Sequence, residues 1–161
     1  MKKHSAGILV YKINQDGQLI VLLAHPGGPY FANKDNAAWT IPKGEYETSE
    51  EPLIAARREF QEEIGQTVPN GELISLGEFT RQDGKNIKAW AVPGKIDITT
   101  VCSNKFEMEW PPKSGNQQAF PEIDRAEWFP AQVALNKLSS GQSIFVFRLA
   151  DYLQIDLPQL P

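Results

Sequence analysis

The segment from Gly44 to Gly65, GEYETSEEPLIAARREFQEEIG, constrains the fold more tightly than any other part of the chain. Ser49 is a favourable N-cap, and Pro52 falls in the first turn of a helix, where its missing N–H costs little. The two glutamates between them suit the positive end of a helix dipole. Gly65 supplies the usual C-terminal stop. The sequence therefore predicts a helix from about residue 50 to residue 64.

This helix has an apolar stripe and a separate face of carboxylates. At 100° per residue, the stripe comprises Leu53, Phe60 and Ile64, and it is expected to face the core. Three carboxylates share a face roughly 120° away: Glu59, Glu62 and Glu63. Their repulsion costs a few tenths of a kcal/mol per pair unless a cation lies between them. Hard oxygen ligands favour Mg²⁺ or Mn²⁺, and the small Ala55 and Ala56 on the same face are expected to leave room for the ion. The alternative is an ordinary solvated face held by salt bridges.

The spacing of identities along the segment resembles the Nudix box. The pattern is glycine, five residues, glutamate, seven residues, Arg-Glu, a bulky apolar residue, one residue, Glu-Glu, one residue and glycine. The resemblance extends to the strands before the box and to FPEIDRAEWF after it. It implies an α/β fold of the α+β kind, an α/β/α sandwich with a mixed β-sheet in which the box is a loop-helix-loop. Gln66 departs from the pattern, which has an aliphatic residue there.

The resemblance also implies a chemistry and a set of roles. Nudix enzymes are pyrophosphohydrolases that use Mg²⁺ or Mn²⁺ to cleave a nucleoside diphosphate linked to another group. The implied metal ligands are the carbonyl of Gly44 and three carboxylates: Glu59, Glu62 and Glu63. Arg58 belongs to the implied catalytic set, and the resemblance makes Arg58 and Glu50 orienting or structural partners. Glu59 is the first choice for the general base, and Glu122 and Glu109 are loop alternatives.

Residues outside the box are candidates for substrate contacts. Lys43 directly precedes Gly44 and is either a phosphate ligand or an exposed turn lysine. Trp110 is the tryptophan best placed to stack on a base, and Glu122 completes the predicted substrate set. Four other side chains lie near expected loops without a pattern that favours a specific role: His25, Lys34, Arg81 and Lys113.

The order of elements suggests a mixed sheet between helical layers. Apolar and alternating runs predict strands at 6–13, 18–25, 72–80, 87–93 and 105–110. Turn formers predict a long surface loop over 26–38 and a second loop region over 110–124. Helices are expected at about 130–138 and 143–155.

Composition sets the remaining bounds. The 161 residues suit a single domain covering 1–161, and the net charge of −4 argues against general nucleic-acid binding. The single Cys102 excludes an internal disulfide. No apolar run approaches the roughly 20 residues of a membrane span. We therefore expect a cytoplasmic protein, monomeric or homodimeric, whose partner is a nucleotide-type small molecule.

The substrate stays open at the level of sequence. Nucleoside triphosphates, dinucleoside polyphosphates, ADP-ribose and nucleotide sugars all fit the box, because residues that select the substrate lie outside it. The WTIPKGEYE segment is similar to the diadenosine tetraphosphate hydrolase branch, and EWPPKSG to a bacterial Nudix group. The branch tyrosine expected after the box is missing, since no tyrosine occurs between Tyr46 and Tyr152. The alternative function is a non-catalytic nucleotide sensor, although such sensors usually lack box carboxylates that are present here.

Overall fold

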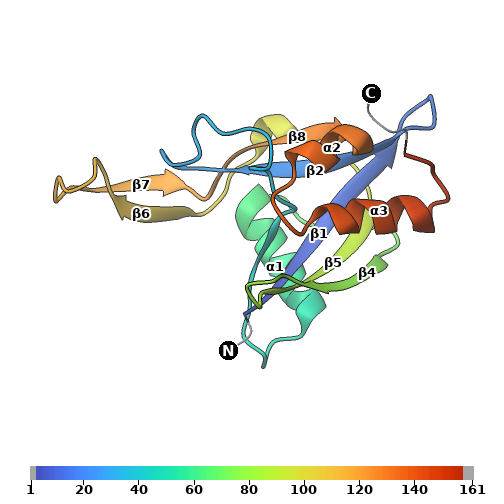
Figure 1. Ribbon diagram of the computed structural model, residues 1–161, viewed down its shortest axis with the longest axis horizontal. Helices are drawn as coiled ribbons and strands as arrows, with labels where there is room; N and C mark the ends of the chain where they lie inside the picture. Colours follow the sequence, from blue (N-terminus) through green and yellow to red (C-terminus); the bar gives the residue numbers. More distant parts are fainter. Residues whose placement is uncertain (1–2, 158–161) are drawn as a thin grey trace.

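Strand β1 (His4–Ile13) is buried without interruption from Ser5 to Tyr11. Because successive side chains of a strand point to opposite faces, an unbroken buried run requires cover on both faces of the sheet. In the computed structural model of the protein, which describes residues 3–157, helix α1 (Pro52–Ile64) covers one face. Helices α2 (Ala131–Lys137) and α3 (Ser143–Tyr152) cover the other (Figure 1). The α/β/α sandwich expected from the sequence is confirmed.

The main sheet is mixed, as predicted. Its order is β4-β5-β1-β2-β8, with β3 beside β1. Strands β1 and β5 run parallel, and the other neighbours are antiparallel. The bounds of the other five strands are β2 (Leu19–Pro26), β3 (Lys43–Glu45), β4 (Ile74–Thr80), β5 (Asn86–Pro93) and β8 (Ile123–Pro130).

Each face of β1 contributes to a different core. Ile8 and Val10 pack in the cluster that contains Phe60 of α1. Leu9 packs in the cluster that contains Phe145 of α3. Alternate side chains of β1 thus pack against the helical layers on both faces of the sheet. Because β3 pairs with β1, this alternation also determines which face of β3 lies toward α1.

Strands β6 (Lys105–Glu109) and β7 (Gln117–Pro121) form a separate two-stranded hairpin that projects from the main sheet (Figure 1). Its root is tied by backbone hydrogen bonds. Asn104 N–H donates to the carbonyl of Glu62 at 2.9 Å, and Glu122 N–H donates to the carbonyl of Asn104 at 2.8 Å. Gly27 N–H then donates to the carbonyl of Glu122 at 2.8 Å, so the root joins α1 to the loop after β2. A short 3-10 turn, η1 (Ile98–Thr100), precedes the hairpin.

Several sequence expectations require correction. The N-cap position of α1 is Glu51, without a side-chain cap hydrogen bond, so the N-cap assigned to Ser49 is wrong and the helix begins at Pro52. The segment 117–121 is strand β7, where a loop was expected, because it finds its partner in β6. Helix α3 ends at Tyr152, where the expected helix continued to residue 155, because Gln154 adopts a positive φ of 56°. No helix in the described part of the chain is long and apolar enough to cross a membrane.

Candidate active site

The site begins where β3 meets α1. Gly44 pairs with Ala6 in the sheet, and a Cβ added at Gly44 would overlap the carboxylate of Glu59. Only glycine therefore allows the strand backbone to approach the helix so closely. The box glycine brings main-chain atoms and a helix carboxylate to the same place.

Arg58 gathers the box carboxylates on the outer side of α1. Its Nε and Nη2 donate to the two oxygens of Glu50, each at 3.0 Å. Its Nη1 donates to Glu59 at 2.9 Å and reaches Glu62 at 3.3 Å. The fork to Glu50 lowers the pKa of that carboxyl, and the pKa of Arg58 is raised by the same hydrogen bonds. In this structure, the Arg58 guanidinium thus provides the positive charge that Glu50, Glu59 and Glu62 share.

Glu63 lies on the inner side of the same helix and is only 8% exposed. It accepts a hydrogen bond from Lys43 N–H at 3.2 Å. Burial, with the charge of nearby Glu59 as the second cause, raises the pKa of Glu63 to about 8. Burial also raises the pKa of Glu59, although the hydrogen bond from Arg58 opposes the shift. Glu59 and Glu63 thus lie close together in a partly buried space, where the nearby positive charge does not balance their two negative charges.

The donor set fits a hard divalent cation. Carboxylate oxygens and the carbonyl of Gly44 are the ligand types that Mg²⁺ and Mn²⁺ prefer, and Gly44 lacks the Cβ that would fill the space. Across residues 3–157, however, no three His, Cys, Asp or Glu side chains are arranged to hold an ion as they stand. The reason is visible in the hydrogen bonds: Glu59 and Glu62 turn to Arg58, whereas Glu63 turns to the backbone. Ala55 and Ala56 were expected to leave room for the ion beside the carboxylates. Instead, both are fully buried in the core.

Lys43 contributes its backbone N–H to this site, whereas its Cβ lies on the other face of β3, next to the Cβ position of Gly7. Its side chain is half-buried, and within the described residues it forms no ion pair. Burial is the main cause that lowers the pKa of Lys43, and Lys85 and Arg81 add to it. The attraction of Glu63 acts in the opposite direction. A desolvated ammonium without a carboxylate partner suits an anionic ligand.

The hairpin separates the other predicted residues. Glu122 lies at its root, and its charge contributes to the raised pKa values of both Glu59 and Glu63. Trp110 lies at the far end of the hairpin, where its backbone N–H donates to the carbonyl of Asn116 at 2.9 Å. Six extended residues, about 20 Å at 3.4 Å per residue, separate it from Asn104 at the root. Glu109 accepts a hydrogen bond from Lys113 N–H there, so the structure does not bring it to the box.

His25 is fully buried and does not face the site. Its Nδ1 lies 3.0 Å from the carboxylate of Asp124, and its Nε2 lies 2.7 Å from the carbonyl of Lys34. The histidine therefore fastens the loop after β2 to β8. The Lys34 ammonium lies 3.6 Å from the centre of the Tyr30 ring, and Arg81 pairs with Asp83 at 3.4 Å.

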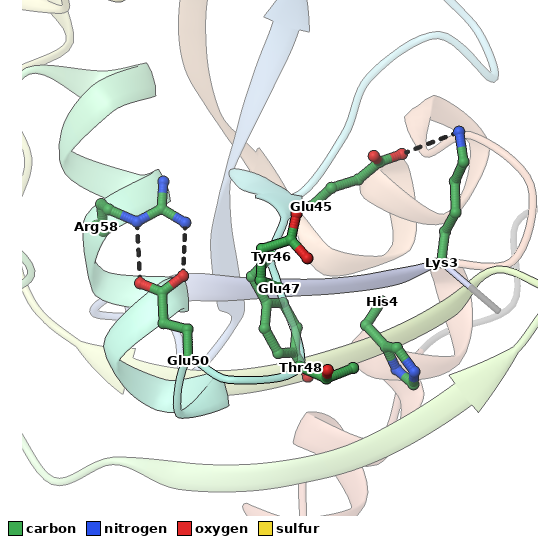
Figure 2. Close-up of a pocket in the computed structure, with 8 residues that line it drawn as sticks. All are labelled: Lys3, His4, Glu45, Tyr46, Glu47, Thr48, Glu50 and Arg58. Atoms are coloured by element: carbon green, nitrogen blue, oxygen red, sulfur yellow. Dashed lines mark hydrogen bonds and ion pairs between the residues drawn. The ribbon is translucent and has the colours of Figure 1, made fainter. Parts of the chain in front are cut away.

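A groove beside the N-terminal end of α1 was missed in the sequence. It has a volume of about 480 Å³, and Figure 2 shows the Tyr46 ring between Glu50 and His4. The complete lining comprises Lys3, His4, Glu45, Tyr46, Glu47, Thr48, Glu50 and Arg58. A smaller neighbouring lobe of about 270 Å³ shares four of these residues and adds Pro52, Glu78, Asn86 and Lys88. The only sequence signal was an aromatic residue, Tyr46, inside the acidic box loop. This signal could not predict a groove, because the groove forms only when the segment before Tyr46 pairs with β1.

Comparison with known proteins bears on this geometry. The model of the NUDIX domain matches residues 3–149. No curated protein sequence matches the chain. Solved structures with a similar fold include an Ap4A hydrolase from C. elegans in a binary complex (18% identity, TM-score 0.63, covering 93% of this chain and 98% of that one). The NUDIX domain of NrtR from Shewanella oneidensis, complexed with ADP ribose, gives 14% identity and a TM-score of 0.59, covering 95% and 89%. The ORF135 protein of E. coli gives 21% identity and a TM-score of 0.57, covering 96% and 92%.

Proposed function

The chain belongs to the NUDIX family, and on this premise we propose that it hydrolyses the pyrophosphate bond of a nucleoside diphosphate linked to another group. Family membership agrees with the expected enzyme class, a pyrophosphohydrolase acting on acid anhydrides. The observation that carries the proposal is the close approach of Gly44 to Glu59, with Glu63 beside them on Lys43 N–H. Backbone and carboxylate oxygens from two elements meet at one partly buried point.

A divalent cation is part of the proposal. Gly44 and three carboxylates would hold it: Glu59, Glu62 and Glu63. When bound, Mg²⁺ or Mn²⁺ would neutralise the diphosphate and acidify a water molecule. Glu59 and Glu62 would have to turn away from Arg58 Nη1, while the fork between Arg58 and Glu50 keeps the arginine in place.

The chain's own side chains divide the remaining work. Glu59 would take the proton of the attacking water, because a carboxylate whose pKa is raised is a stronger base. Glu122 is the alternative base, since it lies at the hairpin root beside the box. Lys43 would bind a substrate phosphate with its unpaired ammonium. Trp110 stays a prediction, and its position suits only a substrate that spans about 20 Å from the hairpin root.

The substrate proposed is a nucleoside triphosphate or a dinucleoside polyphosphate. The fold is shared with a C. elegans Ap4A hydrolase and with a NUDIX domain that was crystallised with ADP ribose, so both ligands belong on the test panel. At 18% and 14% identity, these likenesses support the choice of compounds only.

The experiment is a hydrolysis panel. Purified protein is incubated with triphosphates, diadenosine polyphosphates, ADP-ribose and nucleotide sugars, in Mg²⁺, Mn²⁺ or chelator, and phosphate and nucleotide release are measured. We expect one class to be cleaved, only with metal. Silence across the panel, combined with binding of one nucleotide, would replace the hydrolase by the nucleotide sensor.

A further inference from the structure

The groove around Tyr46 adjoins the candidate active site through Arg58, which lines the groove and also binds Glu59. Tyr46 follows Gly44 by two residues, and its N–H donates to the carbonyl of His4 at 3.0 Å, which continues the pairing of β3 with β1. Residues i and i+2 of an extended strand share a face, at a separation of about 7 Å. The Tyr46 ring therefore lies on the α1 side of the strand, the same side on which Gly44 meets Glu59.

The charges that line the groove are paired, except that of Glu47, so no lining cation is left without a carboxylate partner. Arg58 binds Glu50 at 3.0 Å, Lys88 lies 3.7 Å from Glu78, and Lys3 lies 3.9 Å from Glu45. An anionic phosphate would have to displace one of these pairs. A neutral planar ring needs no such exchange, and the face of Tyr46 offers it a stacking surface.

Asn86 provides a specific polar feature on the smaller lobe. This residue is only 4% exposed, and its amide NH₂ donates to the hydroxyl of Thr80 at 2.9 Å. Its side-chain oxygen has no hydrogen-bond partner among the described residues. Buried acceptors are almost always satisfied, so an unpaired one at the wall of a groove indicates a donor that arrives from outside.

We propose that this groove binds the nucleobase of the substrate. The base stacks on the Tyr46 ring, and its exocyclic amino group donates a hydrogen bond to the side-chain oxygen of Asn86. The role as a substrate subsite rests on the proposed hydrolase function, whereas recognition of the base does not. The phosphates of a base held here extend along the strand toward Gly44 and Glu59.

The first test uses adenosine, which has a base and no phosphate. Its affinity is measured by calorimetry for the wild type and Tyr46→Leu, with Tyr152→Leu as the control because Tyr152 is 59% exposed on another element. We expect Tyr46→Leu to weaken binding about tenfold and Tyr46→Phe to restore it, because the ring carries the stacking. Binding that is equal in the wild type and Tyr46→Leu, or no adenosine binding at all, overturns the proposal.

The second test concerns the amino group. Purine riboside, which lacks it, should bind several-fold more weakly than adenosine, and Asn86→Ala should remove that difference. Circular dichroism verifies that this buried variant folds, and if it does not, the comparison of the two nucleosides in the wild type decides. Equal affinities for adenosine and purine riboside in the wild type would contradict the role of Asn86.

Turnover separates this proposal from the proposed function. With a substrate found in the hydrolysis panel, Tyr46→Leu should raise KM about tenfold, with a smaller effect on kcat. If Tyr46→Leu turns over substrate with an unchanged KM, the hydrolase function stands and the groove is not part of the substrate site. If the protein has no turnover but binds adenosine through Tyr46, the groove stands as a base-binding site and the hydrolase function is wrong.

Discussion

Glu50 and Glu63 belong to the same motif and yet are in opposite electrostatic states. Glu50 receives both arms of the Arg58 fork at 3.0 Å, and the pKa of its carboxyl is lowered. Glu63 is buried beside another carboxylate with one backbone N–H as its donor, and its pKa is raised to about 8. The first glutamate has its counter-ion built into the fold, whereas the second lacks one. The difference supports the proposal that Glu50 serves the architecture and that Glu63 binds an external cation.

The largest expected effect comes from Glu63→Gln. The amide keeps the shape and still accepts from Lys43 N–H, but it removes the charge that would hold the metal. We expect metal-dependent turnover to fall by about 10³-fold or more, with no loss of melting temperature, because the neutral amide avoids the cost of a buried charge. Glu51→Gln, at an exposed position outside the carboxylate network, is the control. Full activity in Glu63→Gln would contradict the assignment of Glu63 as a metal ligand.

Gly44→Ala tests the space between the strand and the helix. The added methyl overlaps the Glu59 carboxylate, so Glu59 or the strand must move. We expect turnover to fall by about 10²-fold, since catalysis depends on geometry held to within about an ångström. Gly17→Ala is the control for a destabilising methyl away from the site, because its φ of 76° strains any side chain although nothing lies within 4 Å of its Cβ position. Equal rates in the two variants would show that the close approach has no catalytic role.

The stability of metal-free protein should fall as pH rises. The folded pKa of Glu63, about 8, exceeds its ordinary value of 4.5, so the folded state binds more protons between these values. Stability is complete below about pH 4.5 and is lost as pH rises through 8, by on the order of 5 kcal/mol for a pKa raised from 4.5 to about 8. Denaturant unfolding in chelator at several pH values measures this change. Glu63→Gln should flatten the curve, and Mg²⁺ should restore stability at pH 8. A flat wild-type curve would contradict the raised pKa.

Glu50→Gln should have the smallest effect. It removes the charge of one fork partner, while Arg58 retains its contacts with Glu59 and Glu62. We expect about a tenfold loss of turnover, because Arg58 is held less firmly and the loss is one of positioning. Steady-state kinetics provide the measurement. A loss as large as that of Glu63→Gln would erase the contrast between the two glutamates.

The parts of the molecule that depend on local sequence were predictable. Helix α1, its stop at Gly65 and the apolar residues Phe60 and Ile64 follow from spacing and caps alone. Strands β1, β2, β4 and β5 were visible as apolar runs for the same reason, whereas β3 and β8 were not predicted. Box residues were identified by their spacing, although their roles as ligands stay predictions.

The parts that depend on distant segments were not predictable. Strand β7 forms because β6 lies opposite to it, and the segment carries no apolar alternation of its own. The burial of Ala55 and Ala56 follows from the position of the sheet, which helical spacing does not reveal. The groove needs residues that are far apart in the sequence, since His4, Tyr46 and Asn86 meet only after β1 pairs with β3 and β5.

The root of the β6–β7 hairpin has a consequence for how this chain can be altered. Backbone hydrogen bonds tie Asn104 to Glu62 and Glu122 to Asn104, so both ends of the arm are clamped beside the helix. The arm pairs only with itself in the described sheets. Doubling the length of a closed loop costs only about 0.6 kcal/mol in chain entropy. The arm is therefore a module that evolution or an engineer can shorten, lengthen or exchange while the carboxylates beneath it stay where they are.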